Sequence, residues 1–376
     1  MKEKIICLFK QETVLCVAFA LAIVSMLFVH PDKEYIGYVD FRTLAILFCL
    51  MSVMAGLQKS GVFQYVAREL LGRVHKAWQL VLILVLLCFF SSMLVTNDVA
   101  LITFVPFPLI ALGMIGPEGK RQLVIPVVVL QTIAANLGSM LTPIGNPQNL
   151  YLYGRAGLSL GDFFKLMLPY AAAALLLASA WSLIAARACR GPVQVTFPGK
   201  AKLSGNKVHL AVYTALFVLA LFTVARVIPY GIMLGVTAIA LLLTDRSIFG
   251  RVDYSLLLTF IGFFLFIGNI GRLPAFSHVL QQIVSGHEIL VGVAASQVIS
   301  NVPAALLLSG FTEDLSALII GVNLGGLGTL IASMASLISY KLIAREESQR
   351  KGAYFRYFTV ANVCFLVILL VLTLIF

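Results

Sequence analysis

Apolar runs separated by short polar connections fill most of the chain. Runs approaching about 20 apolar residues are typical of membrane-spanning helices. Such runs predict helices over residues 14–28, 43–57, 163–186, 209–225, 231–243, 256–270 and 355–376. Two amphipathic stretches, residues 58–76 and 272–285, are typical of helices that lie along the membrane interface. The pattern therefore predicts an all-α polytopic membrane protein.

Four further apolar stretches are each interrupted near the middle by polar residues, glycine or proline. Two of them, residues 80–112 and 289–311, are predicted to be re-entrant helical hairpins that dip into the membrane and return. The other two, residues 123–153 and 315–343, are predicted to be broken helices that cross it. Lipid cannot satisfy the backbone groups at a break, so we expect all four breaks to be buried in protein or to line a wet cavity.

The order of these elements recurs along the chain, and short motifs recur with it. The matched motifs are Val39-Asp40-Phe41 with Val252-Asp253-Tyr254, Thr96-Asn97-Asp98 with Ser300-Asn301-Val302, and Asn136-Leu137-Gly138 with Asn323-Leu324-Gly325. Two repeats are therefore predicted, residues 1–186 and 227–376, separated by a basic linker at 187–207 and a connecting helix at 208–226. The connecting helix makes the number of crossings between the repeats odd, so we expect the second repeat to be inverted.

Lysine and arginine predict the orientation, because cytoplasmic loops of membrane proteins are enriched in both. If both hairpins return to the side from which they enter, 21 of the 27 Lys and Arg residues face the cytoplasm and the other 6 face outside. This arrangement gives about nine full crossings, a cytoplasmic N-terminus and a C-terminus outside. We expect the protein in the lipid of a bacterial inner membrane.

Composition agrees with a single membrane domain. Of 376 residues, 60% are hydrophobic and 11% are charged, against about 25% charged in soluble proteins. The net charge of +11 lies in the predicted cytoplasmic connections, so nucleic acid is not an expected partner. The six cysteines form no CxxC pair, and no metalloprotease motif, Ser/His pair or paired aspartates occur at membrane depth. Neither a cofactor nor a catalytic residue is predicted.

The breaks carry the candidate chemistry. Helix N-termini at a break offer N–H groups to an anion, and unwound carbonyls offer oxygens to a cation. Asp98 is the only carboxylate deep in an apolar stretch, so it is a candidate cation ligand or proton carrier. Capping of a helix that begins at Val99 is the open alternative for Asp98. No Lys or Arg is expected inside the site, so an anion would be held by N–H groups and by Asn, Ser or Thr side chains.

The candidate substrate- and ion-binding residues lie at the interruptions of the two predicted hairpins, which we call the tips, and at the breaks of the two broken helices. They are Thr96, Asn97, Asp98, Asn136, Gly138, Ser139, Thr142, Gly145, Asn146, Ser300, Asn301, Asn323, Gly325, Gly326 and Thr329. A sodium ion is expected near Asn97, Asp98 and Asn301. The alternatives for the breaks are simple kinking at proline and, in the second repeat, close helix packing by glycine and serine.

The motifs resemble those of the ion transporter superfamily. The resemblance lies in residues 39–63, in the two tips and in Asn323-Leu324-Gly325-Gly326. It is nearest to the arsenite permease, citrate permease and sodium/proton antiporter group, and more distant to the divalent-anion/sodium symporters. It implies sodium and substrate sites at the tips and breaks, an elevator-like movement of the hairpin domain and, often, a homodimer. The symporters carry Ser-Asn-Thr at both tips, and this chain departs from that pattern.

These features predict a secondary active transporter of a small inorganic or organic anion, driven by a Na⁺ or H⁺ gradient. Two alternatives stay open: a Na⁺/H⁺ antiporter that uses Asp98, and an efflux permease for neutral arsenite or another metalloid. A channel is disfavoured, because paired breaks suit an occluded site better than an open polar pore.

Overall fold

The computed structural model describes residues 12–375, apart from 188, 190–192, 194–202 and 204–205. The basic N-terminal residues and most of the basic linker therefore lie outside the described residues. The α-helices are α2 (Thr13–Met26), α3 (Tyr35–Tyr38), α4 (Phe41–Lys59), α5 (Val62–Leu71), α6 (Ala77–Ser92), α7 (Asn97–Phe104), α8 (Pro106–Ala111), α9 (Pro117–Ser139), α10 (Pro147–Ala156), α11 (Leu160–Ala186), α12 (Lys207–Val224), α13 (Tyr230–Thr244), α14 (Tyr254–Gly271), α15 (Pro274–Val284), α16 (Glu288–Ile299), α17 (Asn301–Ser309), α18 (Leu315–Leu324), α19 (Met334–Glu346) and α20 (Lys351–Leu372). Short 3₁₀ turns are η1 (Leu112–Ile115), η2 (Arg246–Arg251) and η3 (Ser348–Arg350).

The prediction of an all-helical membrane protein is confirmed. Within the described residues, seven helices are long and apolar enough to cross a membrane. The count rises to eight if α15 and α16, which meet at 109°, form one broken span. The expected nine crossings, the return of the hairpins and the inversion of the repeats stay predictions.

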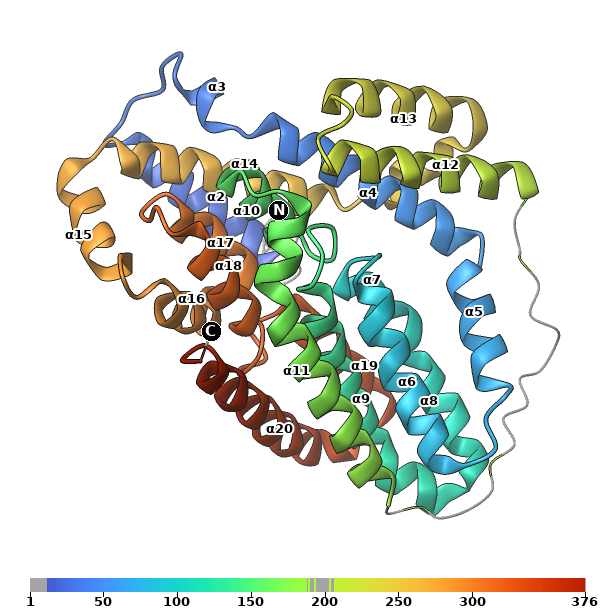
Figure 1. Cartoon of the computed structure of the whole chain (residues 1–376). Helices are drawn as coiled ribbons and strands as arrows, with labels where there is room; N and C mark the ends of the chain where they lie inside the picture. The colour runs from blue at the N-terminus through green and yellow to red at the C-terminus, as the bar shows by residue number, and fades with distance from the viewer. Residues whose placement is uncertain (1–11, 188, 190–192, 194–202, 204–205, 376) are drawn as a thin grey trace, which may run out of the picture.

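The helices fall into two groups that meet along α10 and α17 (Figure 1). In the first group α2 packs along α14, and α12 and α13 pack along α4. In the second group α9 lies among α6, α11 and α20, while α16 packs against α17 and α18. The amphipathic helices α5 and α15 lead from the first group into the second, at opposite sides of the molecule in Figure 1. We call the first group the scaffold and the second the hairpin layer.

All four predicted breaks are present. The predicted hairpins are interrupted where α6 gives way to α7 and α16 to α17, and the long helices break between α9 and α10 and between α18 and α19. The N–H of Asn97, at the first tip, donates to the carbonyl of Gly145 at 3.2 Å. The N–H of Asn301, at the second tip, donates to the carbonyl of Ala332 at 3.0 Å. Each tip is therefore fastened by its backbone to the break of its own repeat.

Glycine lets each hairpin approach its broken helix closely. A Cβ on Gly138 would lie 2.1 Å from the carbonyl oxygen of Phe89, and one on Gly325 would lie 2.6 Å from Oγ of Ser296. Backbones can come this near only where a side chain is missing. The matched glycines therefore serve packing, which is the alternative that the sequence left open for the second repeat.

The ends of α4 and α14 are built alike. Asp40 and Asp253 cap the two helices with φ/ψ of −79°/85° and −79°/84°, accepting from the N–H of Thr43 and Leu256 respectively. Both aspartates are therefore helix N-caps.

Candidate functional site

Buried asparagines join the two repeats at their breaks. Oδ1 of Asn136, in α9, accepts from Oγ of Ser333 at 2.9 Å and from Nδ2 of Asn97 at 2.9 Å. Oδ1 of Asn323, in α18, accepts from Nδ2 of Asn146 at 3.1 Å. Asn136 and Asn323 occupy matched positions, and so do Asn146 and Ser333, the N-cap residues of α10 and α19. Each central asparagine is thus bonded to the N-cap residue of the helix that follows the other repeat's break.

The remaining amide bonds complete this network. Nδ2 of Asn323 donates to Oδ1 of Asn149 at 2.6 Å and to the carbonyl of Ile319 at 2.7 Å. Nδ2 of Asn136 donates to the carbonyl of Gly326 at 3.3 Å. Buried amides are costly unless they are paired, so this pairing fixes how the two breaks meet.

A cavity of about 20 Å³ lies where the breaks meet, and residues of both repeats line it. Its walls are Asn97, Asp98, Pro147, Gln148, Asp253, Leu256, Asn301, Val302, Ser333 and Met334. A volume of this size holds about one water molecule or one small ion. All of these residues lie at or within three residues of the N-terminal ends of α7, α10, α14, α17 and α19. Five helices therefore begin beside this cavity, and a helix N-terminus carries a partial positive charge.

Two residues at this cavity have buried side-chain atoms without a hydrogen-bond partner among the described residues. Gln148 is 1% exposed, and neither its Oε1 nor its Nε2 has a hydrogen-bond partner. Oδ1 of Asp98 is likewise buried and unpartnered. Unsatisfied buried polar atoms are rare in folded proteins and mark places where a water, an ion or a ligand binds. The cavity is therefore the best-supported ligand position in the molecule.

A larger cavity, of about 250 Å³, adjoins it between α4 and the first tip. We call it the access cavity. Thr96, Asp98 and Asn146 line it from the hairpin layer, facing an apolar wall of α4 that includes Met51 and Met54. Gln58, Arg251 and Asp253 line it from the scaffold. Arg251, an exposed residue that ends η2, lines the access cavity, whereas the residues that line the small cavity include no Lys or Arg.

Asp98 is not a helix cap. The N-cap of α7 is Thr96, and Asp98 is the second residue of the helix. The capping alternative is therefore wrong, because the helix begins two residues earlier than Val99. A carboxylate in the first turn is still favoured by the helix dipole, which helps to hold the charge of Asp98 inside the protein.

Several predicted ligands shape the breaks instead of lining a cavity. Oγ1 of Thr142 donates to the carbonyl of Met93 at 2.5 Å, and Oγ1 of Thr329 donates to the carbonyl of Gln297 at 3.1 Å. Ser300 takes a positive φ of 72°, and its Oγ donates to the carbonyl of Ala332 at 3.4 Å. The same supporting role, by hydrogen bond or close contact, belongs to Gly138, Ser139, Gly145, Gly325 and Gly326.

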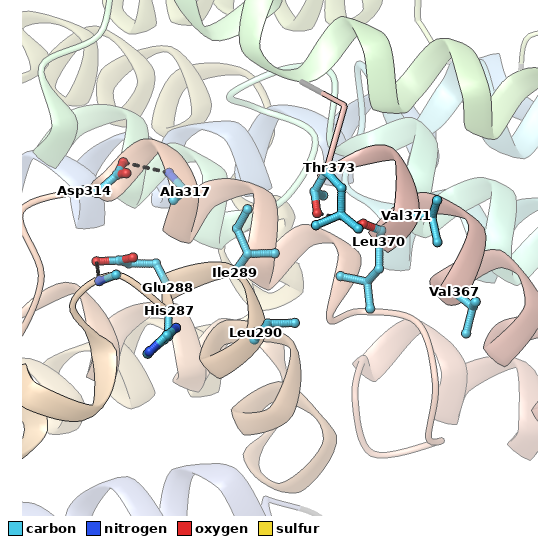
Figure 2. Close-up of a pocket in the computed structure, with 12 residues that line it drawn as sticks. His287, Glu288, Ile289, Leu290, Asp314, Ala317, Val367, Leu370, Val371 and Thr373 are labelled. Atoms are coloured by element: carbon cyan, nitrogen blue, oxygen red, sulfur yellow. Dashed lines mark hydrogen bonds between the residues drawn. The ribbon is translucent and has the colours of Figure 1, made fainter.

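A further cavity, of about 560 Å³, lies away from the four breaks (Figure 2). It opens between the starts of α16 and α18 and the end of α20. Its carboxylates are already engaged: Glu288 accepts from Gly286 N at 3.1 Å and from Thr312 Oγ1 at 2.7 Å, and Asp314 caps α18. This cavity therefore lacks the unpartnered groups found at the tips.

An all-helical membrane protein whose broken helices converge on a small polar cavity is built as a transporter. The chain belongs to the citrate transporter family, whose description (CitMHS, Citrate transporter) matches residues 6–317. It is similar to the inner membrane protein YbiR of Escherichia coli strain K12, with 33% identity over 325 residues that cover 82% of each chain. It is also similar to the uncharacterized transporter MJ0456 of Methanocaldococcus jannaschii, with 30% identity over 82% of this chain and 83% of the relative.

A shorter similarity reaches a plant protein. The silicon efflux transporter LSI3 of Oryza sativa subsp. japonica is 29% identical over 141 residues, which cover 38% of this chain and 28% of the relative. Together with the family, these relatives identify the chain as an integral membrane transporter and favour transport over enzymatic catalysis.

Proposed function

We propose that the protein is a secondary active transporter of a small anion or oxyanion, driven by a Na⁺ or H⁺ gradient. The observation that carries the proposal is the ion-sized cavity at which Asp98 and Gln148 lack partners. Membership of a family described as citrate transporters supports an anionic substrate.

The small cavity offers groups that suit two kinds of ligand. Five helix N-termini and the amides of Asn97, Gln148 and Asn301 suit an anion, since both present N–H groups. The carboxylate of Asp98 suits a cation or a proton that travels with it. A cation bound to the carboxylate of Asp98 lowers the electrostatic cost of binding an anion nearby, and the anion does the same for the cation. The two ligands therefore favour each other's binding, which couples their transport.

We further propose that the hairpin layer moves against the scaffold in an elevator-like way, in a chain with a cytoplasmic N-terminus and inverted repeats. Support comes from the two helix groups and from α5 and α15, which connect them at matched places. In such a movement Asp98 would carry its ligand while Gln58 and Asp253 stay behind. Assembly as a homodimer, which the family resemblance implies, belongs to the same proposal.

A Na⁺/H⁺ antiporter is the second candidate, because one buried carboxylate can bind either cation in turn. An antiporter would move Na⁺ against H⁺ in the absence of any other solute. An anion symporter would move cations only when the anion is present.

The experiment is a flux assay with the purified protein in proteoliposomes. Citrate, phosphate, sulfate and silicic acid are tested as solutes against imposed Na⁺ and pH gradients. We expect saturable, gradient-driven uptake of at least one anion, together with counterflow. Ohmic current would contradict a carrier, and Na⁺/H⁺ exchange without any anion would select the antiporter. Gln148→Ala is expected to weaken uptake while leaving the protein folded, because Gln148 has no internal bond to lose.

A further inference from the structure

A second polar cavity lies at the other end of α4 and α14 from the access cavity. Its volume is about 480 Å³, and we call it the vestibule. The residues that matter for its chemistry are Tyr38, Asp40, Arg42, Tyr151, Arg155 and Phe264. The rest of the lining is largely glycine, so much of its wall is backbone.

The scaffold walls of the two cavities are equivalent. A shift of 213 residues places Asp40 on Asp253 (253 − 40), and the same shift relates the other wall positions. Met51, Met54, Ala55 and Gln58 of the access cavity correspond to Phe264, Ile267, Gly268 and Gly271 of the vestibule. The α14 residues that line the vestibule are therefore the second repeat's equivalents of the α4 residues that line the access cavity.

An aromatic layer separates the two cavities. Leu150 lines the access cavity, and its neighbour Tyr151 lines the vestibule. The ring of Tyr151 packs against Phe264 at 5.5 Å and Phe260 at 6.4 Å, and its hydroxyl bonds to Oγ of Ser309 at 2.9 Å. Packed aromatic rings thus lie between the vestibule and the access cavity.

Arg155 brings a guanidinium to the vestibule without an ionic partner. Among the described residues it pairs with no carboxylate, and its Nη1 donates only weakly, to the hydroxyl of Tyr151 at 3.3 Å. It is not needed to cap α10, because Arg226 already donates to the carbonyls of Tyr153 at 3.2 Å and Gly157 at 3.3 Å.

Arg42 is the second guanidinium, half-buried in the vestibule wall. Its Nη1 lies against Gly154, 3.6 Å from where a Cβ would stand. It too forms no ion pair within the part of the chain that the structure describes. The nearby carboxylate of Asp40 is occupied by the N–H and hydroxyl of Thr43, at 3.0 and 2.5 Å. The position equivalent to Arg42 in the second repeat is Ser255, so this guanidinium has no counterpart there.

We propose that the vestibule is an anion-binding chamber in which Arg42 and Arg155 hold a carboxylate or oxyanion before it reaches the tips. Guanidinium groups offer paired donors that match the oxygens of such anions. The proposal rests on the proposed function in one respect: the captured anion is the one that is transported. The two arginines would then raise the local concentration of the anion in the vestibule, on the far side of the aromatic layer from the access cavity.

Binding is tested with sulfate as the probe, on the purified full chain. The midpoint of thermal unfolding is followed against sulfate concentration at constant ionic strength set with NaCl. The variants are Arg42→Gln, Arg155→Gln and the double variant, with Lys165→Gln as the matched loss of one exposed charge outside the vestibule. Midpoints without sulfate report whether each variant folds.

We expect wild type and Lys165→Gln to be stabilised alike, and the double variant to need at least about tenfold more sulfate for the same shift. Equal stabilisation of wild type and the double variant overturns the chamber. So does an effect that survives in the double variant but disappears in Gln148→Ala, since it would put the anion at the tips.

Transport gives the second readout. In proteoliposomes the double variant is expected to raise KM for an anion entering through the vestibule about tenfold, with kcat within about twofold of wild type. An unchanged KM contradicts the capture role. If wild type moves no anion at all, the proposed function fails, while the sulfate titration still decides whether the chamber binds anions.

Discussion

The two hairpin tips have the same frame and different chemistry. In each, the asparagine that begins the returning helix donates its N–H to a carbonyl of its own repeat's break, from Asn97 to Gly145 and from Asn301 to Ala332. The next residue is Asp98 at the first tip and Val302 at the second, and both line the same small cavity. Repeated backbone contacts thus build two matched tips, and the residue after the asparagine makes only the first tip acidic.

The largest predicted effect concerns the glycines behind the tips. Gly138→Ala forces a Cβ against the backbone carbonyl of Phe89, which cannot move without separating α6 from α9. Gly325→Ala places a Cβ 2.6 Å from Oγ and 2.8 Å from Cβ of Ser296, a smaller overlap than the 2.1 Å approach at Gly138, and the hydroxyl can rotate away. We expect losses in the free energy of unfolding of about 3 kcal/mol for the first and about 1 kcal/mol for the second. Titration with SDS in mixed micelles measures both, and equal losses would refute this reading of the packing.

A smaller difference is predicted for the matched ends of α4 and α14. Nζ of Lys59 lies 2.6 Å from Oδ2 of Asp245, whose side chain is 8% exposed, whereas Nη1 of Arg272 lies 2.6 Å from Oδ2 of Asp32 at a solvent-exposed position. Lys59→Met leaves a buried carboxylate with only the bonds from Tyr213 and Ser247. We expect it to lower the free energy of unfolding by about 2 kcal/mol, and Arg272→Met to leave it unchanged.

The ion pair between Lys59 and Asp245 also predicts how the stability of the protein depends on pH. Burial alone would raise the pKa of Asp245, but the hydrogen bonds from Lys59, Ser247 and Tyr213 hold that pKa well below its usual range. A depressed pKa stabilises the folded protein above the ordinary pKa of aspartate and loses that contribution as the pH falls below it. The stability gap between wild type and Lys59→Met should therefore be constant near neutral pH and shrink in acid. A gap that widens in acid would contradict this assignment.

The sequence predicts the parts of this fold that depend on local pattern. Apolar runs give the helices, and Asn97, Asn301 and the caps Asp40 and Asp253 appear where their motifs place them. It does not predict what depends on how the two helix groups meet. Gln148 follows a proline after the break, and only the position of α10 against both tips makes it a buried amide without a partner.

Arg251 and Asp253 show the same limit. They belong to a connection and a helix cap, and their place at the access cavity follows from the packing of η2 against α4. The available signal for Gln148 was its residue type, because a glutamine close to a membrane break is costly unless it bonds to something. For Asp98 only the capping alternative is wrong, since its helix begins at Asn97 and Thr96 occupies the N-cap position.

The central claim is that Asp98 couples the driving ion to the substrate. Its most direct test compares Asp98→Asn with Val302→Thr in proteoliposomes, measuring anion counterflow without a gradient and uptake driven by Na⁺ or pH gradients. We predict that Asp98→Asn keeps counterflow and loses gradient-driven uptake by about 100-fold, while Val302→Thr keeps both. Gradient-driven uptake at the wild-type rate in Asp98→Asn would contradict the claim.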